Sequence, residues 1–217
     1  MKELEELFSL LEEGTSPYQV VSHTEDYLKK AGFFGLSFGE PWDLALGEKY
    51  YVNHHGTTLF AFTLPKETEK KDKAPFLRLA AAHTDYPCLR IKPSADMSNH
   101  SYAQVNVEVY GGAILNTWLD RPLGVAGRVA VRGKDAFTPE IRRFQSEKNL
   151  MTIPNLAIHM NREVNKGVEL NRQTDLLPIC GLTDGAQNAD YFLNFLAKEL
   201  QVEKQDILDF ELTVYNK

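Results

Sequence analysis

The feature that most constrains the fold is a short apolar run that ends at a histidine and an aspartate. Residues 76–82 read FLRLAAA, and His83-Thr84-Asp85 follow directly. Small residues let neighbouring backbones approach closely, as a central strand flanked by helices requires. The run therefore predicts an internal strand over 76–82. His83 would then lie at its carboxyl end, where open α/β sheets place their ligand sites.

His83 and Asp85 carry the chemistry of this stretch. A neutral imidazole can bind zinc through one ring nitrogen while a nearby carboxylate fixes the tautomer or the ring orientation. His83 is therefore a candidate metal ligand, and Asp85 is a candidate orienting carboxylate. A histidine hydrogen-bonded in an ordinary turn gives the same local pattern, so these two residues taken alone leave both interpretations open.

Composition narrows the class of protein and of partner. With 217 residues, 43% of them hydrophobic and 25% charged, the chain can form one large or two small globular domains. A net charge of −6 gives no indication of a nucleic-acid or anionic-membrane partner. Cys88 and Cys180 lie far apart, which favours thiols in a reducing compartment. The acidic N-terminus lacks a signal core, and no apolar run reaches ~18 residues, so we expect a cytoplasmic protein without a membrane partner.

The first part of the chain alternates helical and strand patterns. Apolar spacing predicts a helix over residues 2–12, and Ser16-Pro17 begins a second helix that ends before Gly32. Further along, residues 50–52 and 58–62 are rich in β-formers and are separated by a turn. The charged residues 66–73 indicate a solvated loop before the strand predicted at 76–82.

The character of the sequence changes after Pro93. Residues 94–100 are polar and indicate a turn that crosses into a second domain, and residues 137–149 read as irregular and charged. Four strands and one amphipathic helix are predicted between and beyond these segments. The strands span 104–110, 125–131, 176–182 and 207–215, and the helix spans 189–200. We expect the part from residue 94 onward to contain at least four strands and its own core.

Several strings in the sequence resemble one family. AAHTDYPCLRIKP (81–93) resembles the metal-site segment of aspartyl aminopeptidases, zinc exopeptidases that remove acidic residues from peptide N-termini. Other matching strings, in the same order as in the family, are SPYQVV (16–21), LKKAGF (28–33), KYYV (49–52), GTTLFAF (56–62), VEVYGGAILNTWLDRPLGVAGRV (107–129), IPNLAIHMNREVN (153–165) and NRQTDLLPI (171–179). The resemblance thus extends along most of the chain.

The resemblance implies a fold class and a division into domains. It implies an α/β chain in which residues 1–93 form the opening part of a zinc-peptidase catalytic domain. Residues 94–217 would form a mainly β oligomerisation domain that is inserted into it. The family binds two zinc ions through further carboxylates and a late histidine, and their sequence contexts do not occur here. We therefore expect the catalytic part to be incomplete and zinc not to be tightly held by this chain alone.

His159 is the second residue to which the resemblance assigns a role. The matching family histidine reaches from the inserted domain into a neighbouring subunit's active site, where it binds substrate or the developing oxyanion. A histidine that is satisfied within its own domain is the alternative. The charged residues Asp120, Arg121, Arg128 and Arg162 could form interface pairs, and the sequence does not decide their roles.

The function implied by the resemblance is zinc-dependent removal of N-terminal Asp or Glu from a peptide substrate, in a homo-oligomer. On this interpretation His83 binds metal, while Asp85 and His159 serve catalysis. The 217-residue chain by itself is expected to be inactive. The alternative is a non-catalytic assembly module or a truncated family member.

Overall fold

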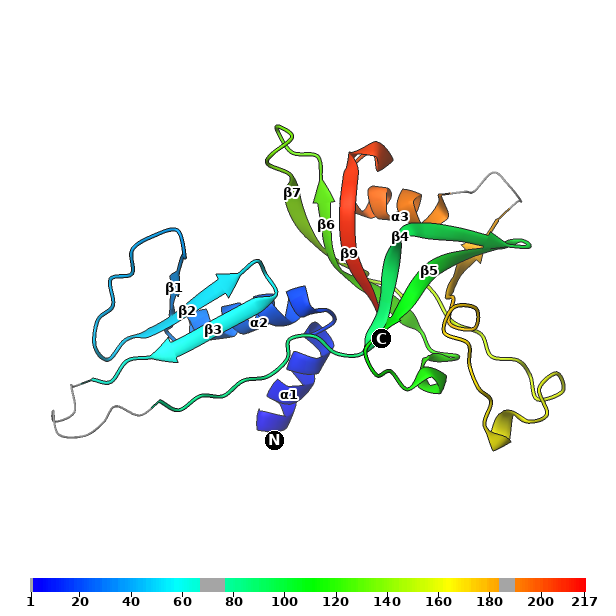
Figure 1. Cartoon of the computed structure of the whole chain (residues 1–217), viewed down its shortest axis with the longest axis horizontal. Helices are drawn as coiled ribbons and strands as arrows, with labels where there is room; N and C mark the ends of the chain where they lie inside the picture. The colour runs from blue at the N-terminus through cyan, green and yellow to red at the C-terminus, as the bar shows by residue number, and fades with distance from the viewer. Residues whose placement is uncertain (1, 67–76, 184–189) are drawn as a thin grey trace. The chain divides into compact units, whose positions relative to one another are not determined.

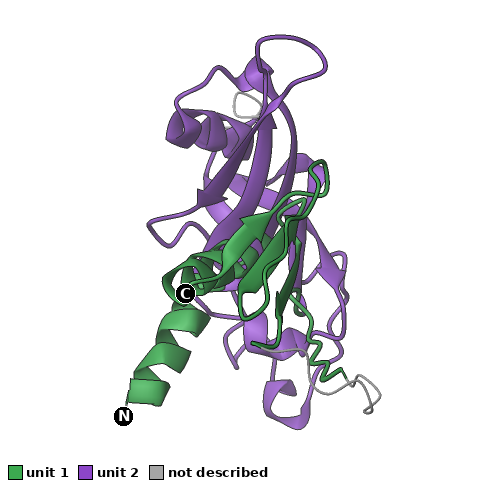
Figure 2. Cartoon of the chain, turned by 90° about the vertical axis from the view of Figure 1, so that its left-hand side faces the viewer, with its two compact units in different colours: residues 1–86 green, residues 87–217 purple. Residues whose placement is uncertain are grey.

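The chain divides into two compact units, residues 1–86 and residues 87–217 (Figure 2). The computed structural model describes residues 2–66, 77–183 and 190–217. Most of the expected charged loop at 66–73 lies outside the described residues. The division between the units falls between Tyr86 and Pro87, before the boundary expected after residue 93.

The difference in the boundary arises at strand β4, which spans Cys88–Asn99. The polar turn expected at residues 94–100 is wrong, because β4 continues through this segment. Pro93 is accommodated where the register between β4 and β5 (Tyr102–Tyr110) shifts, between Ile91 and Asp96. An irregularity of this kind tolerates a residue that cannot donate a ladder hydrogen bond.

Unit 1 begins with the two expected helices, α1 (Lys2–Glu13) and α2 (Pro17–Lys30). Ser16 caps α2, because its hydroxyl oxygen accepts a hydrogen bond from the Tyr18 N–H at 3.2 Å. Gly32 follows the helix with a φ of 81°, a conformation that favours glycine. The sequence signals at both ends of α2 are therefore confirmed.

Three strands form the sheet of unit 1, in the order β1-β2-β3 (Figure 1). They are β1 (Phe34–Leu36), β2 (Lys49–His54) and β3 (Thr58–Thr63). β2 and β3 form the expected antiparallel hairpin, whereas β1 runs parallel to β2. Glu25 joins α2 to this sheet by accepting hydrogen bonds from the Tyr51 hydroxyl at 3.1 Å and the Asn53 amide at 2.7 Å.

The strand expected at residues 76–82 is wrong. Residue 76 lies outside the described residues, and residues 77–82 have no assigned secondary structure. The side chains of Leu77 and Leu79 are 85% and 75% exposed. A strand requires a neighbour that pairs with its backbone, and neither described sheet includes this segment. His83 consequently lies in an irregular segment before β4 and not at the carboxyl end of a strand.

Unit 2 is built on a six-stranded antiparallel sheet with the order β7-β6-β9-β4-β5-β8 (Figure 1). The strands not yet bounded are β6 (Leu123–Val131), β7 (Glu140–Gln145), β8 (Ile179–Leu182) and β9 (Ile207–Asn216). The expected minimum of four strands in this part is confirmed. The irregular segment expected at 137–149 is wrong at residues 140–145, because β7 is a charged edge strand whose Phe144 points into the core.

Helix α3 (Tyr191–Leu200) packs on this sheet through Phe192 and Leu196, which are buried in the core. Its first turn is capped from another element. The carboxylate of Asp96 on β4 accepts hydrogen bonds from the N–H groups of Phe192 at 2.5 Å and Leu193 at 3.2 Å. Burial raises the pKa of Asp96, and these two bonds partly offset that rise.

The core of unit 2 is a single cluster of aliphatic and aromatic side chains from both layers. Its least exposed members include Leu89, Val105, Leu123, Val125, Leu176, Leu196 and Val214. The described part of unit 2 also contains three short 3-10 helices: η1 (Leu115–Trp118), η2 (Val164–Lys166) and η3 (Lys204–Asp206). Among the residues that the structure describes, no helix has the length and apolar character needed to cross a membrane.

Candidate functional site

His83 lies in an irregular segment that other parts of unit 1 hold in place. The Thr84 hydroxyl donates a hydrogen bond to the Thr57 carbonyl at 2.8 Å, next to the β2–β3 turn. The Tyr86 hydroxyl donates to the Gly14 carbonyl at 2.9 Å, between α1 and α2. His83 therefore directly precedes a short stretch that is anchored to two different elements, although its own side chain is 89% exposed.

Within this segment, His83 and Asp85 lie in direct contact. His83 Nδ1 is 3.0 Å from Asp85 Oδ1. A carboxylate in this position favours the tautomer that carries its proton on Nδ1, which leaves Nε2 as the nitrogen able to bind a metal. This is the contact that an orienting carboxylate makes. The metal-binding role itself remains a prediction.

The described residues supply an incomplete set of zinc ligands. A catalytic zinc site takes about three protein ligands and a water molecule. Across residues 2–66, 77–183 and 190–217, the structure brings together no group of three or more His, Cys, Asp or Glu side chains that could hold a metal ion. His83 and Asp85 have suitable chemistry but do not form a zinc site by themselves.

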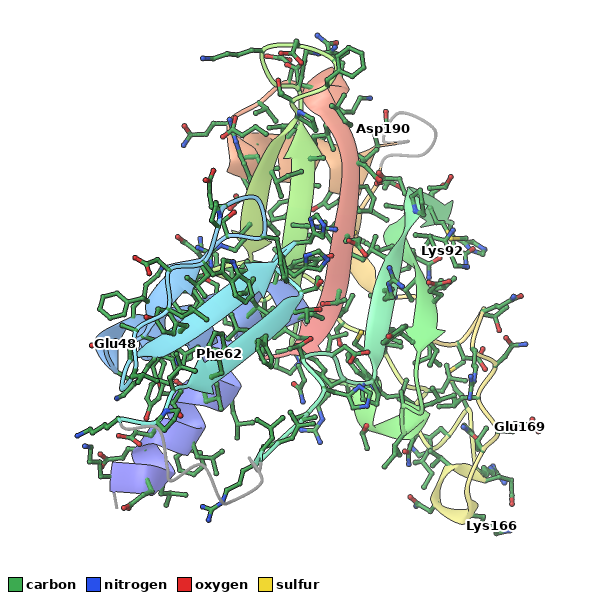
Figure 3. The ribbon with its side chains drawn as sticks, turned by 60° about the vertical axis from the view of Figure 1, so that its left-hand side comes forward. Glu48, Phe62, Lys92, Lys166, Glu169 and Asp190 are labelled. Atoms are coloured by element: carbon green, nitrogen blue, oxygen red, sulfur yellow. The ribbon has the colours of Figure 1, made fainter. Side chains whose placement is uncertain are left out.

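His159 belongs to unit 2, in a long loop that spans residues 154–170 and that we call the His159 loop. Its side chain is exposed. The N–H groups of Met160 and Asn161 donate to the Ala157 carbonyl at 2.8 and 3.1 Å, which makes a tight turn around His159. Figure 3 labels Lys166 and Glu169 further along this loop, where it extends away from β4 and β5.

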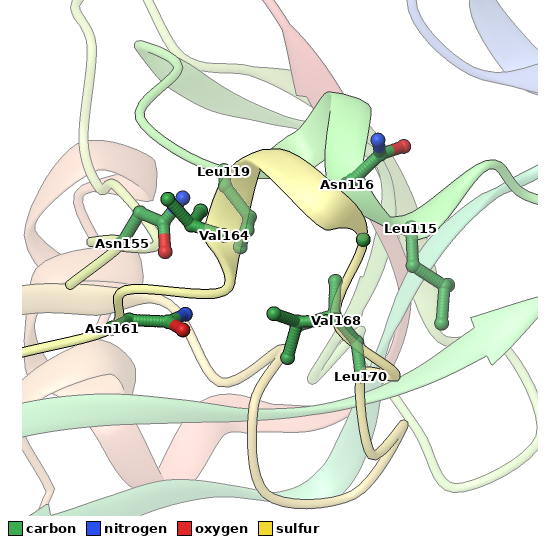
Figure 4. A pocket seen from close by; sticks show the side chains of 9 residues that line it. Leu115, Asn116, Leu119, Asn155, Asn161, Val164, Val168 and Leu170 are labelled. Carbon is green, nitrogen blue, oxygen red and sulfur yellow. The ribbon is translucent and has the colours of Figure 1, made fainter. Parts of the chain in front are cut away.

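A pocket that the sequence did not predict lies beside the His159 loop. It has a volume of about 440 Å³ and opens between the loop and η1 (Figure 4). Its lining combines aliphatic side chains with three amides: Leu115, Asn116, Leu119, Asn155, Asn161, Val164, Val168 and Leu170. These residues come from segments far apart in the sequence, so no local motif could have indicated the pocket.

The surroundings of Arg128 and Cys180 bear on their possible roles. Arg128 pairs within unit 2, where its guanidinium contacts Glu211 of β9 at 2.7 and 3.1 Å. Cys180 is present as a thiol. Burial, with the nearby charge of Asp96, raises the pKa of this thiol to about 12. The thiolate is therefore scarce at neutral pH, and Cys180 is not a candidate nucleophile.

The sequence also matches known proteins. Residues 10–217 match a family of zinc metalloproteases, described as aminopeptidase I zinc metalloprotease (M18). The match covers far more than half of the chain. The chain therefore belongs to the M18 aminopeptidase family, and it corresponds to the N-terminal portion of its members.

Two curated relatives show how much of a family member is present. A probable M18 family aminopeptidase 2 from Clostridium novyi is 43% identical over 212 residues, which cover 97% of this chain and 48% of that protein. Aspartyl aminopeptidase 4 from Saccharomyces cerevisiae is 36% identical over 236 residues, with the same two coverages. The chain spans about half the length of the curated relatives it matches.

Solved structures of the family share the fold. A cryo-EM structure of the Ape4 and Nbr1 complex matches with a TM-score of 0.83 at 29% identity, covering 97% of this chain and 43% of that one. A structure of the mApe1 dodecamer from Saccharomyces cerevisiae matches with a TM-score of 0.70 at 23% identity, covering 98% and 47%. This second likeness shows the fold alone.

Proposed function

We propose that this chain is the N-terminal part of a zinc aminopeptidase that removes acidic residues from peptide N-termini. The observation that carries the proposal is the contact between His83 Nδ1 and Asp85 Oδ1 at 3.0 Å, which leaves the other ring nitrogen available on an exposed side chain. Membership of a zinc metalloprotease family supports it. The preference for acidic residues rests on the similarity to aspartyl aminopeptidase 4.

In this proposal, His83 is one zinc ligand and Asp85 holds its ring. The remaining ligands come from outside the described residues. His159 acts in the active site of a neighbouring subunit of a homo-oligomer, where it binds the substrate or the developing negative charge. A tight turn on an exposed loop suits a residue that reaches another subunit. A cytoplasmic setting is part of the same proposal and agrees with the two thiols.

We also propose that the two units correspond to the opening of the catalytic domain and to an inserted oligomerisation domain. The expected division was at residues 1–93 and 94–217, and the compact units that support the proposal are residues 1–86 and 87–217. β4 and β9 support the insertion because they are paired neighbours, with Leu89 opposite Val214. A domain whose first and last strands are adjacent can be inserted into another domain without separating the flanking segments.

A non-catalytic assembly module is the second candidate. The incomplete set of ligands among the described residues favours it. In that case unit 2, with its own core, would associate with other copies, and His83 would have no metal to bind. Activity after completion of the chain separates the two candidates.

The test uses the 217-residue chain alone and together with the C-terminal half of the Clostridium novyi relative. We expect the chain alone, with zinc added, to hydrolyse peptides with N-terminal Glu or Asp at the background rate, and the completed enzyme to hydrolyse them. His83→Ala in the completed enzyme should lower the rate by about a hundredfold or more. His100→Asn alters another exposed histidine and is the matched control.

Two results would contradict the proposal. Zinc-dependent turnover by the 217-residue chain alone would mean that it contains a complete set of metal ligands. Full activity of the completed His83→Ala enzyme would remove His83 from the metal site and favour the assembly module.

A further inference from the structure

Asp120 has a backbone conformation that its surroundings must maintain. Its φ is 56°, in the left-handed region that residues other than glycine rarely adopt, although Asp and Asn tolerate it better than most. His55 and His100 share this feature in turns between paired strands, and Gln201 shares it at the C-terminal cap of α3. Asp120 lies in the turn that follows η1, one residue beyond the C-cap Leu119. This conformation places the Asp120 N–H and carboxylate against residues 153–155 of the same chain.

Two hydrogen bonds from Asp120 hold the start of the His159 loop. The Asp120 N–H donates to the Ile153 carbonyl at 2.9 Å. Its Oδ1 accepts from the Asn155 N–H, also at 2.9 Å. The two bonds lie on either side of Pro154, which has no N–H of its own. In its left-handed conformation, one residue thus contacts the chain just before and just after this proline.

The position of this clamp determines where the loop leaves the sheet. Ile153 is buried in the core, and the preceding Thr152 exchanges backbone hydrogen bonds with Ile179. Beyond Pro154 the chain leaves this support and enters the turn around His159. Asn155 lines the pocket beside the loop, as does Leu119, the neighbour of Asp120. The clamp therefore lies at the junction of the fixed sheet, the pocket and the loop.

We propose that Asp120 is a positioning residue that sets the conformation of residues 154–161 and thereby the placement of His159. Its importance for catalysis rests on the proposed function of His159. Asp120 itself acts through Asn155 and touches no substrate. The clamp is a property of the 217-residue chain and can be measured without activity.

Three substitutions separate the effect of the Asp120 side-chain acceptor from that of its positive φ. Asp120→Asn keeps both the side-chain acceptor and the tolerance of a positive φ. Asp120→Gly relieves the backbone but loses the acceptor, and Asp120→Ala loses both. Asp135→Ala is the matched control, because Asp135 Oδ1 accepts from the Phe137 N–H at 2.8 Å in another exposed turn.

The first measurement follows amide exchange at Asn155 and the imidazole NMR signals of His159 in the 217-residue chain. We expect exchange at Asn155 to become about tenfold faster in the Ala and Gly variants, with a shift of the His159 signals. Asp120→Asn and Asp135→Ala should resemble the parent. Unchanged exchange and unchanged His159 signals in the Gly variant would overturn the clamp, even if the Ala variant fails to fold.

The second measurement uses the completed enzyme. We expect Asp120→Gly to lower kcat by about tenfold while KM and zinc content stay close to those of the parent, and Asp120→Asn to restore kcat. If His159→Ala lowers kcat but Asp120→Gly does not, the positioning role is overturned. If His159→Ala leaves kcat unchanged, the proposed role of His159 fails, while a changed Asn155 exchange still supports the clamp.

Discussion

The two units differ in how completely they cover their sheets. In unit 2, α3 packs on the apolar side of the sheet, and the buried side chains form one cluster. In unit 1, α2 contacts the side of the sheet that presents Tyr51 and Asn53. The other side presents Phe62, which Figure 3 labels, among further aromatic rings. Several of these rings remain more than half exposed: Phe34, Phe38 and Phe60.

This difference shows whether each unit contains the residues that cover the apolar side of its own sheet. A sheet with two apolar faces is stable when another layer covers each of them. Unit 2 carries its second layer in its own sequence. Among the described residues, unit 1 has the helical layer on one side of its sheet and exposed aromatic side chains on the other. Leu77 and Leu79, outside the sheet, are exposed as well. Unit 2 should therefore be the more stable unit, and unit 1 should depend on a few specific contacts.

The largest effect is expected from Gly127→Ala in β6. Gly127 has a φ of 152°, and an added Cβ would lie 2.0 Å from the Glu211 carbonyl oxygen of the adjacent strand. Because two paired backbones would have to separate, we expect unit 2 to lose roughly 3 kcal/mol or more. Each unit contains one tryptophan, Trp42 or Trp118, so urea unfolding followed by fluorescence in single-tryptophan variants reports on each unit separately.

Gly112→Ala is the control for this substitution, since an added Cβ there meets nothing within 4 Å. An equal loss of stability in both units would show that they unfold together, and the comparison between them would then fail. No measurable loss in unit 2 would contradict the predicted clash.

A smaller effect, confined to unit 1, is expected from Glu25→Gln. Burial raises the pKa of Glu25, but hydrogen bonds from Lys29, Asn53 and Tyr51 outweigh it, so the pKa lies below its ordinary value. The carboxylate thus contributes stability above the ordinary Glu range, and this contribution is lost as the pH falls through the lowered pKa. Near neutral pH we expect a loss of about 1 kcal/mol, limited by partial solvation.

The measurement for Glu25 is urea unfolding of unit 1 near neutral pH and again in acid, with exposed Glu40→Gln as the control. The difference between parent and Glu25→Gln should shrink in acid. A difference that persists unchanged in acid would mean that packing, and not the charge, accounts for it.

The smallest effect is expected from changing Leu77 and Leu79 to serine together. Both side chains are already exposed, so the stability of the 217-residue chain should change by less than about 0.5 kcal/mol. If the proposed catalytic domain covers these residues when complete, the same double variant should reduce assembly of the completed enzyme. A clear loss of stability in the 217-residue chain would show that the segment is already packed.

Most helices and strands follow from apolar spacing or from a run of β-forming residues. Apolar spacing predicted α1, α2, α3, β5 and β6, and runs of β-formers predicted β2 and β3. Spacing does not report burial in every case, because no residue of α1 is buried. The strand expected at 76–82 failed because apolar character does not reveal whether a backbone partner is present. β7 was missed because an edge strand can carry mostly charged residues and still pair along its full length with β6.

The candidate site shows the same limit. His83 and Asp85 are two residues apart, so their contact could be anticipated from the sequence. The pocket and the Asp120 clamp join residues 115–120 to residues 153–170, and a single sequence contains no signal for contacts over that separation. The sequence left the role of Asp120 undecided, and the structure shows its carboxylate in contact with a backbone N–H of the same chain.

The central place of β9 has a consequence for synthesis on the ribosome. β9 pairs with β6 on one side and with β4 on the other, yet it is the last strand of unit 2 to be translated. Until it emerges, β4 and β6 each present an unpaired edge, and the core between them cannot close. Such edges are prone to pair with other chains. The nascent chain therefore passes through an interval in which a holding chaperone, or rapid emergence of residues 207–216, would protect it from aggregation.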